Sequence, residues 1–272
     1  MDVKNIGEGK VVLIAGGGKI YTDIAARFVK SERDLESIIS SPYNKKIVKN
    51  ILTGGHEAAT EFDLFIFGVE CYSRVTEVQL VRKRLASYLI KSGRCDLDGN
   101  RNFNMVIPKN ISSFASKTEL NLENIIIDGI PLLTIKPDIK KIEYIYDSYD
   151  IMYMIENWYQ AGLEEGLAEE DLRYLKPQAT EFKAIIGMNA HALRDWFKIR
   201  CCKNAQKEIR DLANKMLKLC KEAAPDLFED AGSSCIRLKY CPENKYQHES
   251  CRKNIPTQED VVKMIEENWG KR

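Results

Sequence analysis

The chain has 272 residues, 44% of them hydrophobic and 30% charged, and its formal net charge is +1. This composition predicts a globular protein with a sizeable core, and the small net charge argues against nucleic acid or a membrane surface as a partner. No apolar run approaches the roughly 20 residues that cross a bilayer, and the first residues lack a secretory signal pattern. We therefore expect a cytoplasmic protein with reduced cysteines.

Hydrophobic spacing predicts a mixture of helices and short strands in the first third of the chain. The apolar runs predict two strands, and recurrence of apolar residues every three or four positions predicts three helices. One helix ends at a glycine pair, and another begins at Ser73 as its N-cap. The strands are expected at 11–14 and 62–70, and the helices at 20–39, 44–53 and 73–90.

The remainder of the chain predicts a hairpin insert and several helices. Asp128-Gly129 between apolar runs indicates a hairpin within 124–146. A strand is expected at 103–107, and helices at 148–161, 168–174, 190–223 and 257–268. Together these elements predict an α+β fold with a mixed or antiparallel sheet and long helices. One domain is expected over residues 1–230, followed by a Cys/Lys-rich tail with a short helix over 231–272.

The segment from Gln79 to Arg94, QLVRKRLASYLIKSGR, has the richest supply of anion-binding groups. On a helix, Arg82 and Arg84 project in nearly opposite directions and reach two different ligands. Ser92-Gly93-Arg94 offers a hydroxyl, backbone N–H groups and a guanidinium, which suit a phosphate monoester. A solvated basic helix face fits the same residues. The same two alternatives, an anion-binding cluster and a solvated helix face, stay open for Arg194, Arg200 and Arg210.

The cysteines of the tail do not have the spacing of a common zinc site. Cys235, Cys241 and Cys251, with Cys220 and His248 nearby, are separated by gaps wider than the compact C-x₂₋₄-C pairs of such sites. We therefore predict no metal, and separate thiols are the favoured interpretation.

Several motifs in order resemble the flavin-dependent thymidylate synthase family. The run RKR, then seven residues, then Ser is similar to the family signature of Arg-His-Arg, seven residues, Ser. The segments HEAATEF at 56–62, NFNMVIP, DLRYLKP and NAHALRDWFKIR follow the family's order over roughly residues 45–230. Linked motifs in register are more specific than any one short pattern.

The resemblance implies an enzyme that methylates dUMP to dTMP. It implies FAD as the cofactor, NADPH as the reductant and methylenetetrahydrofolate as the carbon donor. It also implies a homotetramer in which neighbouring subunits share each active site, with no protein nucleophile. A reduced flavin carries the difficult chemistry, and the protein supplies placement and electrostatics.

The resemblance also assigns roles to individual residues of this chain. It implies that Arg200 is catalytic, because this arginine grips and polarises the uracil. The implied nucleotide-binding residues are Gln79, Ser92, Gly93, Arg94, Arg173 and Arg200. The implied flavin-binding residues are His56, Glu61, Arg82, Lys83, Arg84, Asn189, His191 and Asp195.

The chain departs from the family pattern mainly in the residues around the flavin. Lys83 replaces the signature His, His191 replaces a frequent Arg, and Asp195 replaces a frequent His or Asn. Asp195 places a negative charge where a phosphate is expected. Ile90 replaces a usual Glu beside the nucleotide and accepts no hydrogen bond. The alternative function is therefore a divergent paralogue that binds a pyrimidine nucleotide, either with different one-carbon chemistry or without catalysis.

Overall fold

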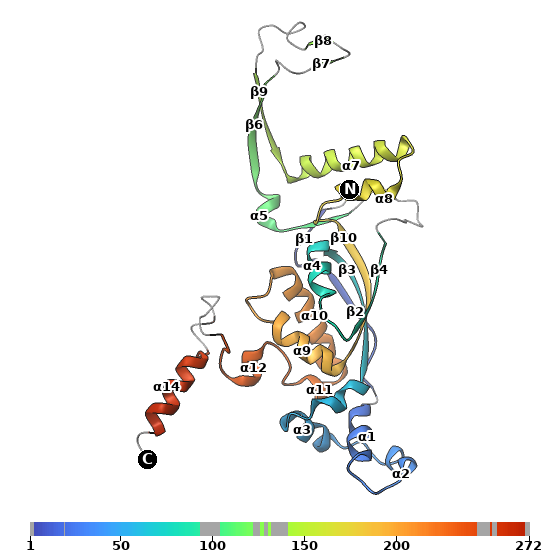
Figure 1. Cartoon of the computed structure of the whole chain (residues 1–272), viewed down its shortest axis with the longest axis vertical. Coiled ribbons are helices and arrows are strands. Elements are labelled where there is room, and N and C mark those ends of the chain that lie inside the picture. The colour runs from blue at the N-terminus through green and yellow to red at the C-terminus, as the bar shows by residue number, and fades with distance from the viewer. Residues whose placement is uncertain are drawn as a thin grey trace. The chain divides into compact units, whose positions relative to one another are not determined.

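The computed structural model of the chain divides into two compact units (Figure 1). The first unit contains residues 1–6 and 92–180, and the second contains residues 7–91 and 181–272. The structure describes residues 3–18, 20–92, 104–121, 126–127, 130–131, 141–243, 251 and 255–269. The predicted boundary near residue 230 remains a prediction.

In the described residues, the first unit contains two-stranded sheets, one long helix and several short helices. Its strands are β1 (Val3–Asn5), β5 (Met105–Ile107), β6 (Ala115–Asn121), β7 (Ile126–Ile127), β8 (Ile130–Pro131) and β9 (Lys141–Asp147). β1 pairs with β5 in parallel, whereas β6 with β9 and β7 with β8 form antiparallel pairs. Its helices are α5 (Lys109–Ser112), α7 (Ser148–Glu164), α8 (Glu169–Leu172) and the 3₁₀ turn η3 (Arg173–Leu175). β7 and β8 pair within 124–146, where a hairpin is expected, and the assignment of this range as an insert stays a prediction.

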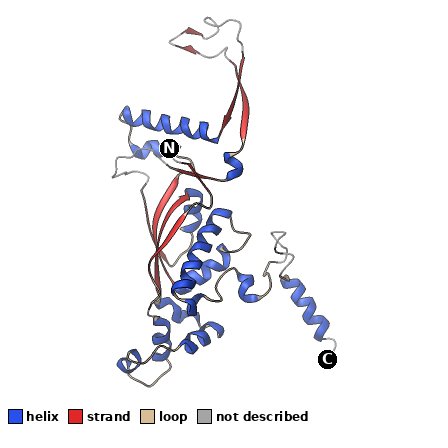
Figure 2. Ribbon diagram, turned by 180° about the vertical axis from the view of Figure 1, so that it is seen from behind, coloured by secondary structure: helices blue, strands red, loops and turns tan. Residues whose placement is uncertain are grey.

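The second unit is built on a four-stranded antiparallel sheet, whose strands are among the red arrows of Figure 2. The strand order is β2-β3-β10-β4. These strands are β2 (Lys10–Ala15), β3 (Leu64–Ser73), β4 (Ala86–Ile90) and β10 (Glu181–Asn189). The helices that precede β4 are α1 (Tyr21–Phe28), α2 (Leu35–Ile39), α3 (Lys45–Thr53), the 3₁₀ helix η1 (Glu57–Phe62) and α4 (Arg74–Leu80). Those that follow β10 are α9 (Ala190–Arg200), α10 (Lys207–Ala223), α11 (Pro225–Phe228), α12 (Ser234–Leu238) and α14 (Gln258–Trp269). This architecture confirms the predicted α+β class.

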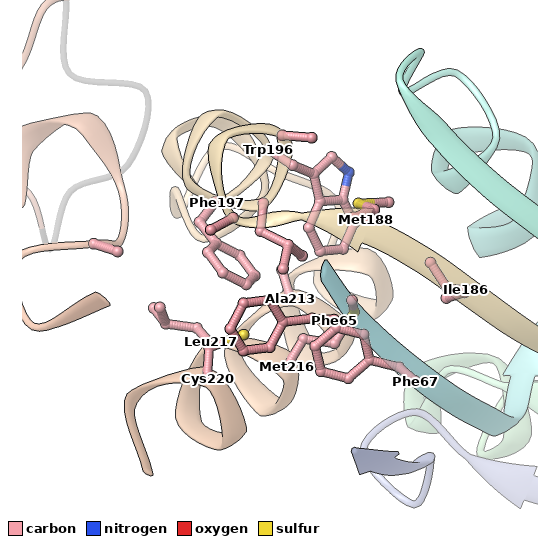
Figure 3. Packing of buried hydrophobic residues seen from close by; sticks show 14 of the residues in the cluster. Phe65, Phe67, Ile186, Met188, Trp196, Phe197, Ala213, Met216, Leu217 and Cys220 are labelled. Carbon is pink, nitrogen blue, oxygen red and sulfur yellow. The ribbon is translucent and has the colours of Figure 1, made fainter. Parts of the chain in front are cut away.

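The core of the second unit lies between one face of this sheet and the helices α9 and α10 (Figure 3). Phe65 and Phe67 point from β3 toward Phe197 of α9 and Met216 of α10, and all four are no more than 1% exposed. The Phe65 ring meets the Phe228 ring edge-on at 5.2 Å. Full burial of one such side chain stabilises the fold by about 1.5–3 kcal/mol, so this layer fixes α9 on the sheet.

The predicted helix over 73–90 is wrong in its second half. α4 ends at Leu80, and residues 86–90 form β4, which pairs with β10. Burial along β4 alternates residue by residue, as expected of a strand. The apolar residues of this segment also recur at helical spacing, which is why the sequence pattern favoured a helix. Leu85 has a positive φ of 58°, which no helix continues. The segment is therefore a helix, a turn and a strand.

Two predicted long helices are interrupted, and another continues through a glycine. The expected helix 20–39 separates into α1 and α2, because Asp34 caps a new start by accepting a bond from the Ser37 N–H. The expected helix 190–223 separates into α9 and α10, because the Gln206 side chain caps α10. α7 passes through Gly162, and a Cβ there would lie only 2.5 Å from the side chain of Leu172.

A buried carboxylate ties α10 to the end of β3. Glu208 is 1% exposed, and its two oxygens accept bonds from the Ser73 backbone N–H at 2.7 Å and from the Ser73 hydroxyl at 2.5 Å. Ser73 does occupy the N-cap position of α4, but its side chain makes no capping bond there. Its hydroxyl serves a contact between distant segments instead.

We expect Glu208→Ala to lower the free energy of unfolding by about 3 kcal/mol, because it leaves two buried donors of Ser73 unsatisfied. Urea unfolding of the full chain measures this change. Glu222→Ala is the matched control, since Glu222 is an exposed residue of the same helix. Equal losses for the two variants would contradict the role assigned to Glu208.

Candidate functional site

The residues that the sequence assigns to ligands fall in both units. The second unit contains His56, Glu61, Gln79, Arg82, Lys83, Arg84, Asn189, His191, Asp195 and Arg200. Ser92 and Arg173 belong to the first unit, where Arg173 is exposed at the start of η3. Gly93 and Arg94 lie outside the described residues. The structure therefore tests the mutual arrangement of the residues in the second unit only.

Arg82, Lys83 and Arg84 lie in the turn between α4 and β4, not on a helix. The expectation that Arg82 and Arg84 point in opposite directions from one helix therefore does not apply. Both guanidinium groups are exposed, and neither has a carboxylate within ion-pair distance in the part of the chain that the structure describes. The turn thus presents positive charge that the described residues do not neutralise.

Arg200 is the last residue of α9 and meets the same segment. Its Nη2 donates a bond of 3.3 Å to the backbone carbonyl of Gln79, whereas the Gln79 side chain bonds back to Val75 of its own helix. Burial, and second the positive charge of nearby Arg82, lower the pKa of Arg200. An arginine keeps its proton despite such a shift. Arg200 thus lies against the helix that leads to Arg82, and neither arginine has a carboxylate partner among the described residues. Guanidinium groups of this kind are able to bind an anion or an electron-rich ring edge.

The start of α9 carries two further candidates. Asn189 is the N-cap, and its side-chain oxygen accepts a 2.8 Å bond from the N–H of Ala192. His191 follows, half-buried, with Nδ1 3.8 Å from a carboxylate oxygen of Glu57. The capping bond occupies the amide oxygen of Asn189, so its NH₂ group is the part that remains to face a ligand.

Lys83 and Asp195, two of the substitutions that change charge in the candidate site, contact each other. Lys83 Nζ lies 2.5 Å from Asp195 Oδ2, and Lys198 Nζ lies 3.7 Å from the other oxygen. The hydrogen bond from Lys83 is the main cause that lowers the pKa of Asp195, so the carboxylate is ionised at neutral pH. The negative charge that Asp195 introduces is therefore neutralised within the site.

A buried charge network beside the site was missed by the sequence analysis. Arg194 is 2% exposed rather than solvated, and its guanidinium binds Asp230 at 2.7 Å and the carbonyl of Leu227 at 2.6 Å. Glu57 lies 3.7 Å from Arg194 Nε and 2.5 Å from Arg237. The network joins η1, α9 and the segment after α11. Only tertiary contacts reveal it, because its members are far apart in sequence.

His56 and Glu61 lie at the two ends of η1, and both side chains are exposed. The His56 backbone N–H donates to the carbonyl of Ile51, which fixes the connection between α3 and η1. η1 in turn contacts α1, α3 and α9. The position of His56 is therefore determined by packing, while its ring remains accessible.

The cysteines in and near the tail lie in different environments. Cys220 packs in the main core, where burial raises its pKa. Burial also raises the pKa of Cys251, and the neighbouring thiols of Cys202, Cys241 and Cys235 raise it further. Within the described residues, no group of three or more His, Cys, Asp or Glu side chains is arranged to hold a metal ion. Nor is any helix in those ranges both long and apolar enough to cross a membrane.

Comparison with known proteins identifies the family. A family model described as "Thymidylate synthase complementing protein" matches residues 18–226. The flavin-dependent thymidylate synthase of Nitratidesulfovibrio vulgaris is 37% identical over 73% of this chain and 72% of its own length. The chain belongs to the flavin-dependent thymidylate synthase family. The similarly named protein of Geobacter sulfurreducens is 33% identical over 77% of this chain and 78% of its own length.

Solved structures agree on the fold. The UMP/dUMP methylase PolB from Streptomyces cacaoi, solved with 5-Br dUMP, aligns with a TM-score of 0.60 at 18% identity, covering 84% of this chain and 96% of that one. At this identity the likeness supports the fold alone. Membership in the family confirms the resemblance and the predicted enzyme class, a flavin-dependent methyltransferase. The roles of individual residues remain predictions.

We expect a double-mutant cycle of Lys83→Met and Asp195→Asn to show a coupling of about 0.5–1 kcal/mol in the free energy of unfolding, because the pair is partly exposed to solvent. The folded-state pKa of Asp195 lies below its ordinary 3.8. The coupling is therefore present above that pH and is lost as the pH falls through the lowered pKa. Urea unfolding at neutral and at acid pH measures it.

Lys198→Met is the matched control for this cycle, since Lys198 is the more distant cation beside Asp195. Its coupling to Asp195→Asn is expected to be smaller. A coupling as large as that of Lys83, or one that survives acid, would count against the assigned pair.

Proposed function

We propose that the chain methylates dUMP to dTMP, with a flavin as FAD, NADPH as the reductant and methylenetetrahydrofolate as the carbon donor. Family membership supports the reaction class, and the 3.3 Å bond from Arg200 Nη2 to the carbonyl of Gln79, three residues before Arg82, is the observation that carries the proposal. The guanidinium groups of Arg82 and Arg200 belong to segments about 120 residues apart in sequence, yet the charge of Arg82 lowers the pKa of Arg200. An uncompensated pair of this kind is stable when an electron-rich ligand lies between or beside the two groups.

In this proposal Arg200 holds the uracil of the nucleotide. A guanidinium offers parallel N–H donors that fit the oxygen and nitrogen atoms of a pyrimidine edge. Donors fixed before the reaction stabilise negative charge that develops on the ring. The bond from Arg200 to the Gln79 carbonyl supplies this fixation and leaves other N–H groups of the fork for the substrate.

The donor groups on the turn after α4 fit a flavin with a pyrophosphate. Arg82 and Arg84 are exposed cations without a described carboxylate partner, and two phosphates need two such groups. Lys83 neutralises Asp195, so this carboxylate does not repel a phosphate. A bound reduced flavin supplies the hydride, while Asn189, His191, His56 and Glu61 line its site in this proposal.

The remaining nucleotide contacts in this proposal come from two further segments of the chain. Ser92, Gly93, Arg94 and Arg173 are assigned to the phosphate and sugar, from the same chain or from a neighbouring copy. β4 leads directly to this segment, because the Lys91 N–H continues its pairing with Lys183. The segment proposed to bind the phosphate therefore begins directly after strand β4 in the chain, and not after a helix as the sequence pattern predicted.

A homotetramer is part of the proposal, and the open face of the sheet supports an association between copies. Val12 and Ile14 on β2, Leu89 on β4 and Ile185 on β10 are large apolar side chains between 41% and 74% exposed. An apolar sheet face of this kind is usually covered by a partner. In this proposal neighbouring subunits share each active site, so several chains contact one nucleotide. The proposed location of the enzyme is the cytoplasm.

A second candidate function is suggested by Ile90 and by the fold relatives. PolB is described as a methylase of both UMP and dUMP. Ile90, half-buried on β4, stands where the family has a Glu and accepts no hydrogen bond. The alternative is a paralogue that binds another pyrimidine nucleotide, with a different one-carbon outcome or without catalysis.

We expect Arg200→Ala to lower kcat/KM for dUMP by about 10²–10³, the effect of losing one donor fixed on developing charge. Tritium release from dUMP labelled at C5, with NADPH and methylenetetrahydrofolate present, measures turnover. Arg200→Lys is expected to fall between wild type and alanine, since it keeps the charge without the fork. Lys218→Ala, which removes an exposed cation from α10, is the control. Wild-type turnover by Arg200→Ala would defeat the proposal.

The two candidate functions differ in their choice of nucleotide. In this proposal Ile90 faces the ribose, where an apolar side chain leaves the 2′-hydroxyl of UMP without a partner, at a cost of about 1–3 kcal/mol. We therefore expect the protein to bind dUMP about tenfold more tightly than UMP. Calorimetric titration measures both affinities, and Ile90→Glu is expected to narrow the difference. Equal affinities, combined with no tritium release, would favour the non-catalytic alternative.

A further inference from the structure

Three buried polar atoms face one another at the start of α9 without a direct hydrogen bond. Oε2 of Glu57 lies 3.8 Å from Nδ1 of His191 and 3.7 Å from Nε of Arg194. All three atoms are buried, and none has a hydrogen-bond partner among the described residues. Both distances exceed a direct hydrogen bond by less than about 1 Å, and one carboxylate oxygen is able to accept from two donors. Glu57 is therefore the acceptor toward which Nδ1 of His191 is directed.

The His191 ring has one buried nitrogen and one open side. Its side chain is 35% exposed, whereas that of Glu57 is 8% exposed. Because Nδ1 is a buried atom, the open side of the ring is the one that carries Nε2. In a neutral imidazole one nitrogen donates and the other accepts, and the partner of one nitrogen fixes the role of the other. With Nδ1–H directed at Glu57, Nε2 is the nitrogen that faces a ligand.

The charges around Glu57 balance one another. Oε1 of Glu57 binds Arg237 at 2.5 Å, and Arg194 binds Asp230 at 2.7 Å. All four residues belong to the second unit, as does His191. Two carboxylates and two guanidinium groups therefore leave no net charge beside Nδ1.

The other charges on this face of α9 are paired as well. Asp195 follows His191 by one helical turn, which places the two side chains on the same face. The Asp195 carboxylate binds Lys83 at 2.5 Å and lies 3.7 Å from Lys198. Among the side-chain types that surround Nδ1 and Nε2, histidine is the one that changes charge between about pH 5 and 8.

From these contacts we propose that His191 exchanges a proton with solvent while it faces the flavin, and that Glu57 is the residue that positions it. The proposal rests on the proposed function, in which His191 lines the flavin site. One proton moves between Nε2 and a solvent water, and no other bond changes.

The two forms of His191 offer different groups to a ligand. The protonated ring donates from Nε2 to an anionic atom, whereas the neutral ring presents Nε2 as an acceptor. An arginine, which the family resemblance expects at this position, always donates. Charge and hydrogen bonds beside a flavin ring tune its electronics. In this chain the flavin site therefore responds to pH through His191.

Histidine NMR of the full-length protein, without added ligand, tests the role of Glu57. The chain has three histidines, and the signal that disappears in His191→Arg is that of His191. We expect Glu57→Gln to move the titration midpoint of this signal to lower pH by about one unit, because a carboxylate beside Nδ1 favours the charged ring. Arg237→Gln is expected to move it to higher pH, because the carboxylate loses a competing cation. Glu222→Gln, whose carboxylate lies beside Lys218 on α10, is the control and leaves the midpoint unchanged.

The opposite directions of these shifts separate positioning from a purely structural role. A residue that only supports the fold changes the thermal stability without moving the His191 midpoint. A midpoint that either variant leaves unchanged, or moves in the other direction, would overturn the proposal. Thermal unfolding shows whether each variant has folded, and if Glu57→Gln has not, the result for Arg237→Gln decides.

Titration with FAD measures the consequence for the ligand. We expect the wild type to bind FAD about tenfold more weakly at about pH 8.5 than at about pH 5.5, because His191 loses a positive charge beside an anion. His191→Arg keeps its charge and is expected to lose less affinity over the same range. An equal loss in the two proteins would count against the proposal.

Binding of dUMP and of FAD by the wild type at neutral pH is measured on the same samples. If the wild type binds both while the His191 midpoint does not respond to Glu57, the proposal fails and the proposed function stands. If the wild type binds neither, the proposed function fails, and the proposal fails with it, even where the midpoints shift.

Discussion

The candidate site of the second unit depends on the packing of one helix, α9, against the sheet. Leu193, Trp196 and Phe197 fix this helix on β3 and β10, and all three are buried. The remaining positions of the same helix are then held in space, from Asn189 at its start to Arg200 at its end. Because interiors pack densely, a shift of α9 would disturb the whole layer. The core therefore determines how accurately Arg200 meets the carbonyl of Gln79.

Charge is distributed unevenly around this helix. The pairs Lys83–Asp195 and Arg194–Asp230 are neutralised internally, whereas Arg82, Arg84 and Arg200 have no carboxylate partner among the described residues. Interactions of the first kind stabilise the scaffold and cancel charges that would repel an anion. Groups of the second kind remain available to a ligand. This division, more than the number of basic residues, separates a binding site from a solvated basic surface.

Arg33 is oriented by serine hydroxyl and carbonyl groups, just as Arg200 is oriented by the Gln79 carbonyl. Neutral acceptors orient a guanidinium without cancelling its charge.

The sequence by itself determined the α+β class, the hairpin, the family and the identity of the candidate residues, because these follow from local apolar spacing and from ordered motifs. It did not determine that residues 81–90 form a turn and a strand. The apolar residues of this segment fit both the spacing of a helix and the alternation of a strand, and pairing with β10 selects the strand. Nor did the sequence determine that Lys83 neutralises Asp195, or that Arg194 is buried. Those outcomes are contacts between residues far apart in the chain, and only the tertiary structure sets such distances.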